Sequence, residues 1–441
     1  MSSAMLFINC LLALDTQAVQ AGINRSAIEK VPFVLPAGVH TTGTLRLPSF
    51  AHLRFAPGAI LRMTRQDADY APPERLGFEP YADRETSIFE HALLFSTDTD
   101  NVTIDGPGLI QCDRLQRGGP KPIALRRCRN VKLLGFTIDQ APNYAVSLID
   151  CLKVDIGGLT ITRAHSDGID LDGTRDARIH DCDIESYDDA ICLKSSASLK
   201  RRLMTSNIVV ENCRLKSSSA FFKIGTETFG DFQKIRVRKL IMTGGTGNRH
   251  GNPGIAIMTV DGGTIRDVIV EDISMTQVGT PIFLRIGDRK RAPGVPSAGD
   301  IEGVHLRRIT ARGTRYPSVI AGLVDAPIRR LVMEQLDLEA AVSDRAHDPR
   351  QSVLETRSAY PEPTQFGPIP ASVLFMRHAL APRIGVFKYP SLPQPPAVLL
   401  DQVTGNWQGC EEVIAERWAC LGDRPPQQHG SGVRPREKRF P

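Results

Sequence analysis

Short runs in which apolar and polar residues alternate recur along most of the chain, and each run ends at a small or polar residue. Copies of the first kind of run lie roughly 23 to 36 residues apart, a spacing typical of solenoids. They begin at Asn101, Asn130, Lys153, Asp176, Asn207, Lys234, Asp267, Gly303 and Arg330. A second alternating run lies between many of these copies, beginning at Val146, Ile169, Ile191, Phe222, Ile255 and Ile282.

The alternation has a period of two residues, which places every second side chain on one face of a strand. No helical pattern separates the runs, so we expect a single-stranded right-handed parallel β-helix, a solenoid with apolar side chains stacked inside. A β-propeller fits less well, because its blades need about 40 or more residues and hairpin turns. A short N-terminal capping helix is predicted to begin at Asp15.

Residues 15–405 are predicted to form this β-helix as one domain, although the length alone suggests about three domains. Residues 1–14 form an atypical N-terminal segment. Its apolar part, Ala4 to Leu14, is too short to cross a membrane, and no Lys or Arg precedes it as in a secretion signal. Residues 422–441 are rich in Pro, Gly, Arg and Gln, which predicts a disordered tail.

Composition and charge narrow the function only slightly. The chain is 41% hydrophobic and 23% charged, as expected of a protein with a sizeable core. A net charge of +5 is mild, so no nucleic-acid partner is expected, and no membrane association is expected either. The nine cysteines form no C-x-x-C pair, which favours buried free thiols over disulfides or a metal site. We therefore expect no metal and no cofactor.

Carboxylates are concentrated in two neighbouring turns of the repeat. Asp167, Asp170 and Asp172 lie in the first, and Asp188 and Asp189 lie in the second. Crowded carboxylates repel one another unless they bind a metal or take different protonation states, as in general acid–base catalysis. We favour the second explanation, in which crowding raises at least one pKa.

Several motifs resemble glycoside hydrolase family 28, the polygalacturonases and rhamnogalacturonan hydrolases. The opening Asp15-Thr16-Gln17-Ala18 is similar to the start of these enzymes. Ser166-Asp167-Gly168 resembles their Asn-Thr-Asp-Gly motif, and Asp188-Asp189-Ala190 resembles their Gly-Asp-Asp motif. The resemblance extends from about Asp15 to about Gly405.

The resemblance implies inverting hydrolysis of α-linked galacturonic-acid polymers, with an acidic polysaccharide or oligosaccharide as the partner. By position, Asp188 would be the general acid, and Asp167 and Asp189 would activate the attacking water. The resemblance also implies a secreted or periplasmic location, although residues 1–14 do not form a convincing signal peptide. The sequence leaves the oligomeric state open.

Two family motifs are altered. The His of the family's Gly-His-Gly segment is replaced by Ala220. The family's Arg-Ile-Lys motif falls on Gly254-Ile255-Ala256-Ile257-Met258-Thr259, where both cations are absent. Residues on neighbouring coils stack about 4.8 Å apart, so other outward cations are candidates for binding a uronate carboxylate. The candidate substrate-binding residues are Asp170, Lys194, Lys223, Glu227, His250, Arg285 and Arg289, with Lys223 and Arg285 preferred.

Two alternatives stay open. The first is a pectate-type lyase, in which the aspartates would bind Ca²⁺ and β-elimination would leave an unsaturated product. The second is a carbohydrate-binding protein with a decayed active site, suggested by the altered motifs. A further segment, Leu354 to Ala371, interrupts the repeats with four prolines and is expected to form a long ordered loop over one face.

Overall fold

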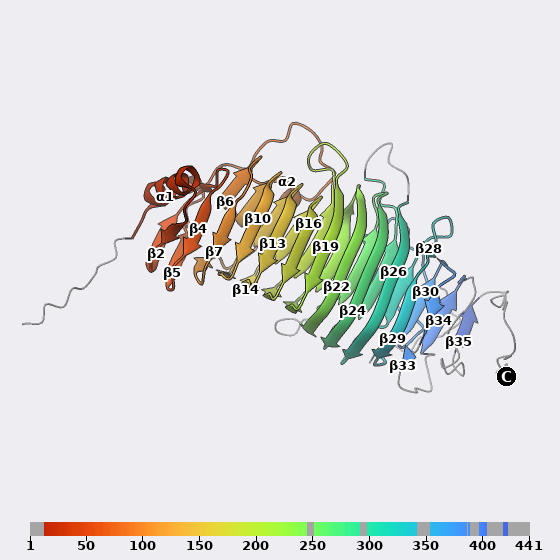
Figure 1. The fold of residues 1–441 in the computed structure, drawn as a ribbon. Coiled ribbons are helices and arrows are strands. Elements are labelled where there is room, and N and C mark those ends of the chain that lie inside the picture. The colour runs from red at the N-terminus through yellow and green to blue at the C-terminus, as the bar shows by residue number, and fades with distance from the viewer. Residues whose placement is uncertain are drawn as a thin grey trace, which may run out of the picture.

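The protein is an elongated solenoid of stacked coils (Figure 1). The computed structural model describes residues 13–244, 251–291, 298–341, 353–385, 387–388, 397–403 and 418–421. The predicted N-terminal segment 1–14 lies mostly outside this part of the chain, and the predicted tail 422–441 and His250 lie entirely outside it. Within the described residues, no helix is long and apolar enough to cross a bilayer.

Two parallel sheets form the walls of the solenoid. The 13-stranded sheet contains β3 (Leu45–Arg46), β6 (Ala92–Thr97), β9 (Lys121–Arg126), β12 (Val146–Ile149), β15 (Ile169–Asp172), β18 (Ile191–Ser195), β21 (Phe222–Thr228), β23 (Ile255–Thr259), β25 (Ile282–Ile286), β27 (Ser318–Ala321), β30 (Leu374–Arg377), β34 (Val398–Asp401) and β35 (Trp418–Leu421).

The 22-stranded sheet contains β1 (Phe33–Leu35), β2 (Gly38–Thr42), β4 (His52–Phe55), β5 (Ala59–Met63), β7 (Thr103–Asp105), β8 (Leu109–Gln111), β10 (Arg129–Leu134), β11 (Thr137–Asp139), β13 (Leu152–Gly157), β14 (Thr160–Ala164), β16 (Arg175–His180), β17 (Asp183–Ser186), β19 (Met204–Glu211), β20 (Arg214–Ser217), β22 (Asp231–Gly244), β24 (Thr264–Thr276), β26 (Asp300–Arg312), β28 (Ile328–Arg329), β29 (Val332–Leu338), β31 (Ala379–Leu380), β32 (Arg383–Ile384) and β33 (Phe387–Lys388). The predicted parallel β-helix is confirmed.

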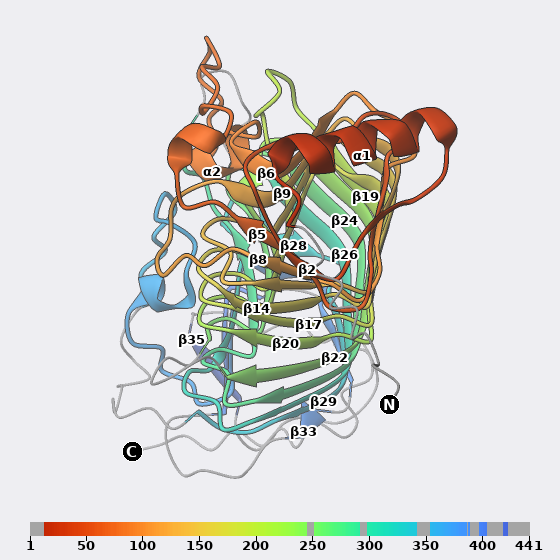
Figure 2. The same ribbon diagram turned by 90° about the vertical axis from the view of Figure 1, so that its left-hand side faces the viewer.

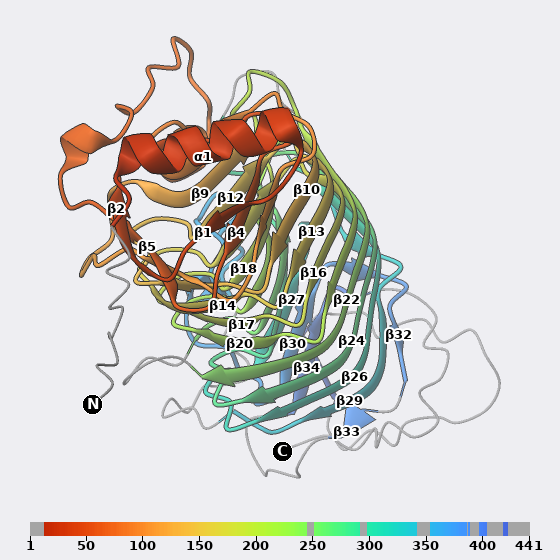
Figure 3. The same cartoon turned by 60° about the vertical axis from the view of Figure 1, so that its left-hand side comes forward.

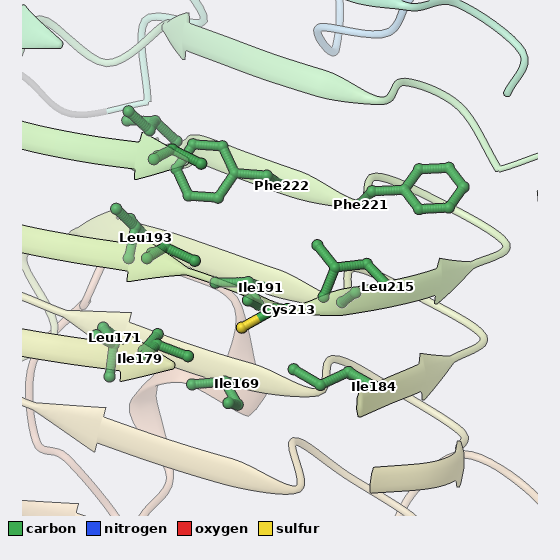
Figure 4. Packing of buried hydrophobic residues seen from close by; sticks show 14 of the residues in the cluster. Ile169, Leu171, Ile179, Ile184, Ile191, Leu193, Cys213, Leu215, Phe221 and Phe222 are labelled. Atoms are coloured by element: carbon green, nitrogen blue, oxygen red, sulfur yellow. The ribbon is translucent and has the colours of Figure 1, made fainter. Parts of the chain in front are cut away.

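The register keeps like side chains stacked from coil to coil. Ile169 of β15 pairs with Ile191 of β18, which pairs with Phe222 of β21. These side chains point inward and pack against residues of the 22-stranded sheet such as Ile184 and Leu215 (Figure 4). The residues between them point outward, so Asp170, Cys192 and Lys223 form one outward column.

The chain bends at the first residue of many runs of the first kind. Asn101, Asn130, Asp176, Asn207 and Asp267 all have φ between 54° and 60°. Asn and Asp tolerate this left-handed conformation better than most residues because their short polar side chains bond locally. The recurring polar residue in the sequence pattern is therefore the corner of each coil.

The helix α1 (Thr16–Glu29) covers the N-terminal end of the solenoid, as predicted (Figure 2). The carboxylate of Asp15 accepts a hydrogen bond from the Ala18 backbone N–H at 2.8 Å and so caps the helix. Val19 and Ile23 are buried against the first coil. The helix thereby shields apolar side chains and strand edges that would otherwise face water.

Two segments leave the coils and matter for the site. The first, residues 64–91, contains η1 (Asp67–Asp69) and α2 (Arg84–Ser87), and α2 lies outside the stack of coils (Figure 3). The second, residues 353–371, contains η2 (Pro363–Phe366) and is called the covering segment here. Its Phe366 and Ile369 pack in one cluster with the outward residues Phe283 and Phe375 of the 13-stranded sheet, which confirms the predicted ordered loop.

Candidate active site

Two consecutive coils bring the aspartates together. Asp167 precedes β15, and Asp188 and Asp189 precede β18. The Gly168 N–H donates to the Asp189 carbonyl at 2.8 Å, and the Asp189 N–H donates to Oδ1 of Asp167 at 3.3 Å. A Cβ atom on Gly168 would lie 2.5 Å from the Ala190 carbonyl oxygen, so only glycine allows the two turns to approach this closely.

Asp167 is buried and has a strongly raised pKa. Burial is the main cause, and the charges of Asp188, Asp189 and Asp170 add to it, whereas Lys194 opposes it. Lys194 Nζ lies 3.3 Å from Oδ2 of Asp167 and also contacts Asp170. The raised pKa favours the protonated form of Asp167.

Asp189 has the opposite shift. Burial, the largest single effect, would raise its pKa, but Lys223, with Nζ 2.7 Å from Oδ2, together with Lys194 and Ser219 lowers it. Its other oxygen accepts hydrogen bonds from the Ser219 hydroxyl at 3.0 Å and the Ala220 N–H at 3.1 Å. Asp167 and Asp189 are therefore driven to different protonation states, the arrangement expected of acid–base pairs.

Asp188 is the most accessible of the three aspartates, with 26% of its side chain exposed. Its carbonyl oxygen accepts hydrogen bonds from the hydroxyls of Ser186 at 2.7 Å and Ser217 at 2.6 Å, which fix the turn. Its carboxylate contacts the guanidinium of Arg117, a residue that the sequence pattern did not single out.

A second group of side chains lies behind Lys194. Lys194 Nζ donates to the Tyr144 hydroxyl at 2.9 Å, and Lys121 lies 5.2 Å from the Tyr144 ring centroid. Lys121 Nζ also donates to Ser147 Oγ at 3.1 Å. Burial is the main cause that lowers the pKa of Lys121 to about 7. Nothing in the sequence pattern pointed to Lys121 as part of the site.

Glu227 and Arg289 form a neighbouring cluster with Asp261 and Arg291. Glu227 is fully buried, and burial, with a contribution from Asp83, raises its pKa to about 7. Its Oε2 accepts from Arg291 at 2.8 Å. Arg289 donates to Asp261 Oδ1 at 2.9 Å and to the Thr226 carbonyl at 2.7 Å. These donors are already engaged within the cluster.

Arg285 is not brought to the aspartates. It points outward, as predicted, from a position paired with Met258, but the covering segment buries it. Its Nη2 donates to the carbonyls of Glu355 at 2.8 Å and Thr356 at 3.1 Å, so it holds the covering segment. Ala256 and Met258, from the segment in which the family cations are absent, are buried in the same cluster as Phe366.

One group among the described residues has the geometry of a metal site: oxygen atoms of Asp167 and Asp189 and Sγ of Cys192 lie within 4.8 Å of one another. The donor set does not suit Ca²⁺, which takes six to eight oxygen ligands. Each carboxylate already contacts a lysine, and burial raises the pKa of Cys192 well above its usual value, which keeps the thiol protonated. The group is better explained by acid–base chemistry.

The described cysteines support the expectation of free thiols. Cys112, Cys128, Cys151, Cys182, Cys192 and Cys213 are all buried and form no disulfide.

Solved structures similar to this one share its fold. An exopolygalacturonase from Thermotoga maritima has a TM-score of 0.63 at 18% identity, with 75% of this chain and 84% of that chain covered. A polygalacturonase from Erwinia carotovora has a TM-score of 0.59 at 22% identity, with 74% and 91% covered.

Sequence relatives and a family match complete the comparison. A probable polygalacturonase from Vitis vinifera is 24% identical over 337 residues, which is 70% of this chain and 66% of that protein. One from Arabidopsis thaliana is 23% identical over 280 residues, 59% of this chain and 60% of that protein. The chain thus spans less than two thirds of these relatives. Residues 90–339, more than half of the chain, match the sequence model for glycosyl hydrolases family 28, and the chain belongs to that family.

Proposed function

We propose that the protein is a glycosidase that hydrolyses α-linked, galacturonic-acid-containing pectic polysaccharides or oligosaccharides with inversion of configuration. The observation that carries the proposal is the ionised Asp189, paired with Lys223, directly beside the accessible Asp188, with the buried Asp167 hydrogen-bonded to the same turn. Hydrolysis with inversion needs one carboxylic acid and one carboxylate on opposite faces of the sugar.

In this mechanism Asp189 is the general base. Lys223 keeps its carboxylate ionised, and the bonds from Ser219 and Ala220 hold one oxygen, leaving the carboxylate oriented to accept a proton from water. Asp167, neutral because it is buried, positions the same water. The water oxygen bonds to the anomeric carbon as the glycosidic bond breaks.

Asp188 is the general acid in the same step. It gives its proton to the leaving glycosidic oxygen while Asp189 takes one from the water, so the enzyme as a whole neither gains nor loses a proton. A single displacement of this kind inverts the anomeric carbon. The lysines beside the aspartates add positive charge, which favours an acidic sugar.

The test measures release of reducing ends from polygalacturonate and rhamnogalacturonan, with ultraviolet absorbance followed in parallel. We expect release without new absorbance by the wild type and a loss of at least about 100-fold in Asp188→Asn, the scale of a general acid. New absorbance would instead identify a lyase. Sugar binding without release on any of these substrates would favour a binding protein.

A further inference from the structure

Arg117 lies between two carboxylates at the mouth of the site. Its Nε donates to Oε1 of Glu85 at 2.9 Å and its Nη2 contacts the other oxygen of Glu85. Its Nη1 contacts Oδ2 of Asp188. The guanidinium therefore uses one edge for Glu85 and turns the other toward the proposed general acid.

Hydrogen bonds fix the backbone that directly follows Arg117. The Gly118 N–H donates to the Pro142 carbonyl at 2.8 Å, and the Asn143 side-chain amide donates to the Gly119 carbonyl at 3.0 Å. Gly118 and Gly119 have φ of 107° and 129°, which residues with a Cβ rarely adopt. Glu85 belongs to α2, and the hydroxyl of its neighbour Thr86 lies 3.3 Å from that of Tyr144.

Of the cations discussed above, Arg117 is the most accessible. Its side chain is 48% exposed, against 4% for Lys194, 11% for Lys223 and 10% for Arg289. A ligand can reach it without first separating a buried ion pair.

The contact with Asp188 places a guanidinium against an oxygen that the proposed function uses. Nη1 of Arg117 contacts Oδ2 of Asp188, so a leaving glycosidic oxygen can approach this atom only when Arg117 has moved away.

We propose, building on the function above, that Arg117 binds the uronate carboxylate of the substrate and leaves Asp188 when it does so. Glu85 is a positioning residue that occupies the Nε edge, so Asp188 and the substrate compete for the Nη1 edge. A planar guanidinium suits this exchange because it pairs with carboxylates along either edge. Binding of an acidic sugar then uncovers Oδ2 of Asp188 for the leaving glycosidic oxygen.

The test compares Arg117→Gln with Arg308→Gln as the matched control. Arg308 also bridges two carboxylates, Glu271 and Asp272, but on the 22-stranded sheet. We expect Arg117→Gln to lower kcat/KM on a galacturonate oligosaccharide about 10- to 100-fold, the value of a charge-assisted pair. On the carboxyl-reduced oligosaccharide, kcat/KM of Arg117→Gln should stay close to the wild-type value. Arg117→Lys should recover part of the kcat/KM that Arg117→Gln loses on the acidic oligosaccharide.

The comparison of the two substrates separates this role from a merely structural one. Damage to the fold or to the site would lower kcat/KM on the acidic and the carboxyl-reduced oligosaccharide alike, whereas loss of the carboxylate partner lowers it only on the acidic one. Equal losses on the two substrates would overturn the proposal.

Titration calorimetry keeps the inference separate from the proposed function. If the wild type turned over no substrate, the proposed function would fail, and binding of the galacturonate oligosaccharide would still be measured. Weaker binding by Arg117→Gln than by Arg308→Gln would support recognition of the carboxylate by Arg117. Equal affinities would overturn it.

Discussion

At the scale of residues, the site depends on which lysine each buried aspartate contacts. Lys223 touches Asp189 and lowers its pKa, while Lys194 divides its charge between Asp167 and Asp170 and does not overcome the burial of Asp167. Two neighbouring carboxylates thereby acquire different proton affinities.

Replacing Lys223 should change the acidic limb of the pH profile. The base acts only when ionised, so activity falls as the pH drops through the pKa of Asp189. Without Lys223 that pKa rises, and the acidic limb of kcat/KM should move up by about 1 to 3 pH units in Lys223→Ala, the effect of an opposite charge in contact. Lys223→Arg, which keeps the charge, should shift it less. An unmoved limb would contradict the role given to Lys223.

Replacing Lys194 should mainly cost stability. Its ammonium is buried with Asp170, Asp167 and Tyr144, so Lys194→Met leaves buried polar groups without their partner. We expect the free energy of unfolding in urea to fall by about 3 to 5 kcal/mol. Lys216→Met is the control: Lys216 pairs with Glu185 at the surface with 44% of its side chain exposed, and about 0 to 1 kcal/mol is expected. Equal losses of unfolding free energy in Lys194→Met and Lys216→Met would contradict the structural role given to Lys194.

At the scale of elements, the outward columns could be predicted because parallel strands keep a constant register. The column of Asp170, Cys192 and Lys223 follows directly from the period of two residues. The outward direction of Arg285 was also predicted, but its surroundings were not. The register shifts within β21, and the covering segment buries Arg285 beneath it.

The segments that leave the coils carry no such period. Arg117 and Glu85 come from segments without alternating residues. Arg117 contacts Asp188, 71 residues away in the chain, and Glu85, 32 residues away. A pattern of local alternation holds no information on such distant pairs. The only sequence signal near Arg117 is the pair Gly118 and Gly119, which marks a turn without indicating its partner.

Phe366 is predicted to hold the covering segment. Its buried ring lies 6.5 Å from that of Phe283, edge to face, and 5.1 Å from the guanidinium of Arg285. Phe366→Ala should lower the free energy of unfolding by about 3 to 5 kcal/mol, or release the segment first and make it sensitive to limited proteolysis. Phe50→Ala, at a side chain 42% exposed, serves as the control. If Phe366→Ala kept both the stability and the protease resistance of the wild type, this role of Phe366 would be contradicted.

At the scale of the whole molecule, the solenoid supplies a stack of coils on which the site is built, and segments outside the coils approach it from different parts of the chain. Arg117, between β8 and β9, reaches Asp188, and Glu85 of α2 reaches Arg117. Tyr360 of the covering segment lies near Lys223 and Asp189: Lys223 opposes the rise in its pKa, but burial and Asp189 raise it. The fold follows from the repeats, whereas substrate access depends on segments outside them.

The stereochemistry of the first product tests the central claim most directly. Proton NMR during hydrolysis of an α-linked trigalacturonate distinguishes the anomers of the new reducing end before they interconvert. A single displacement by Asp188 and Asp189 predicts that the β-anomer appears first. Initial formation of the α-anomer would mean two displacements through a covalent intermediate and would contradict the account.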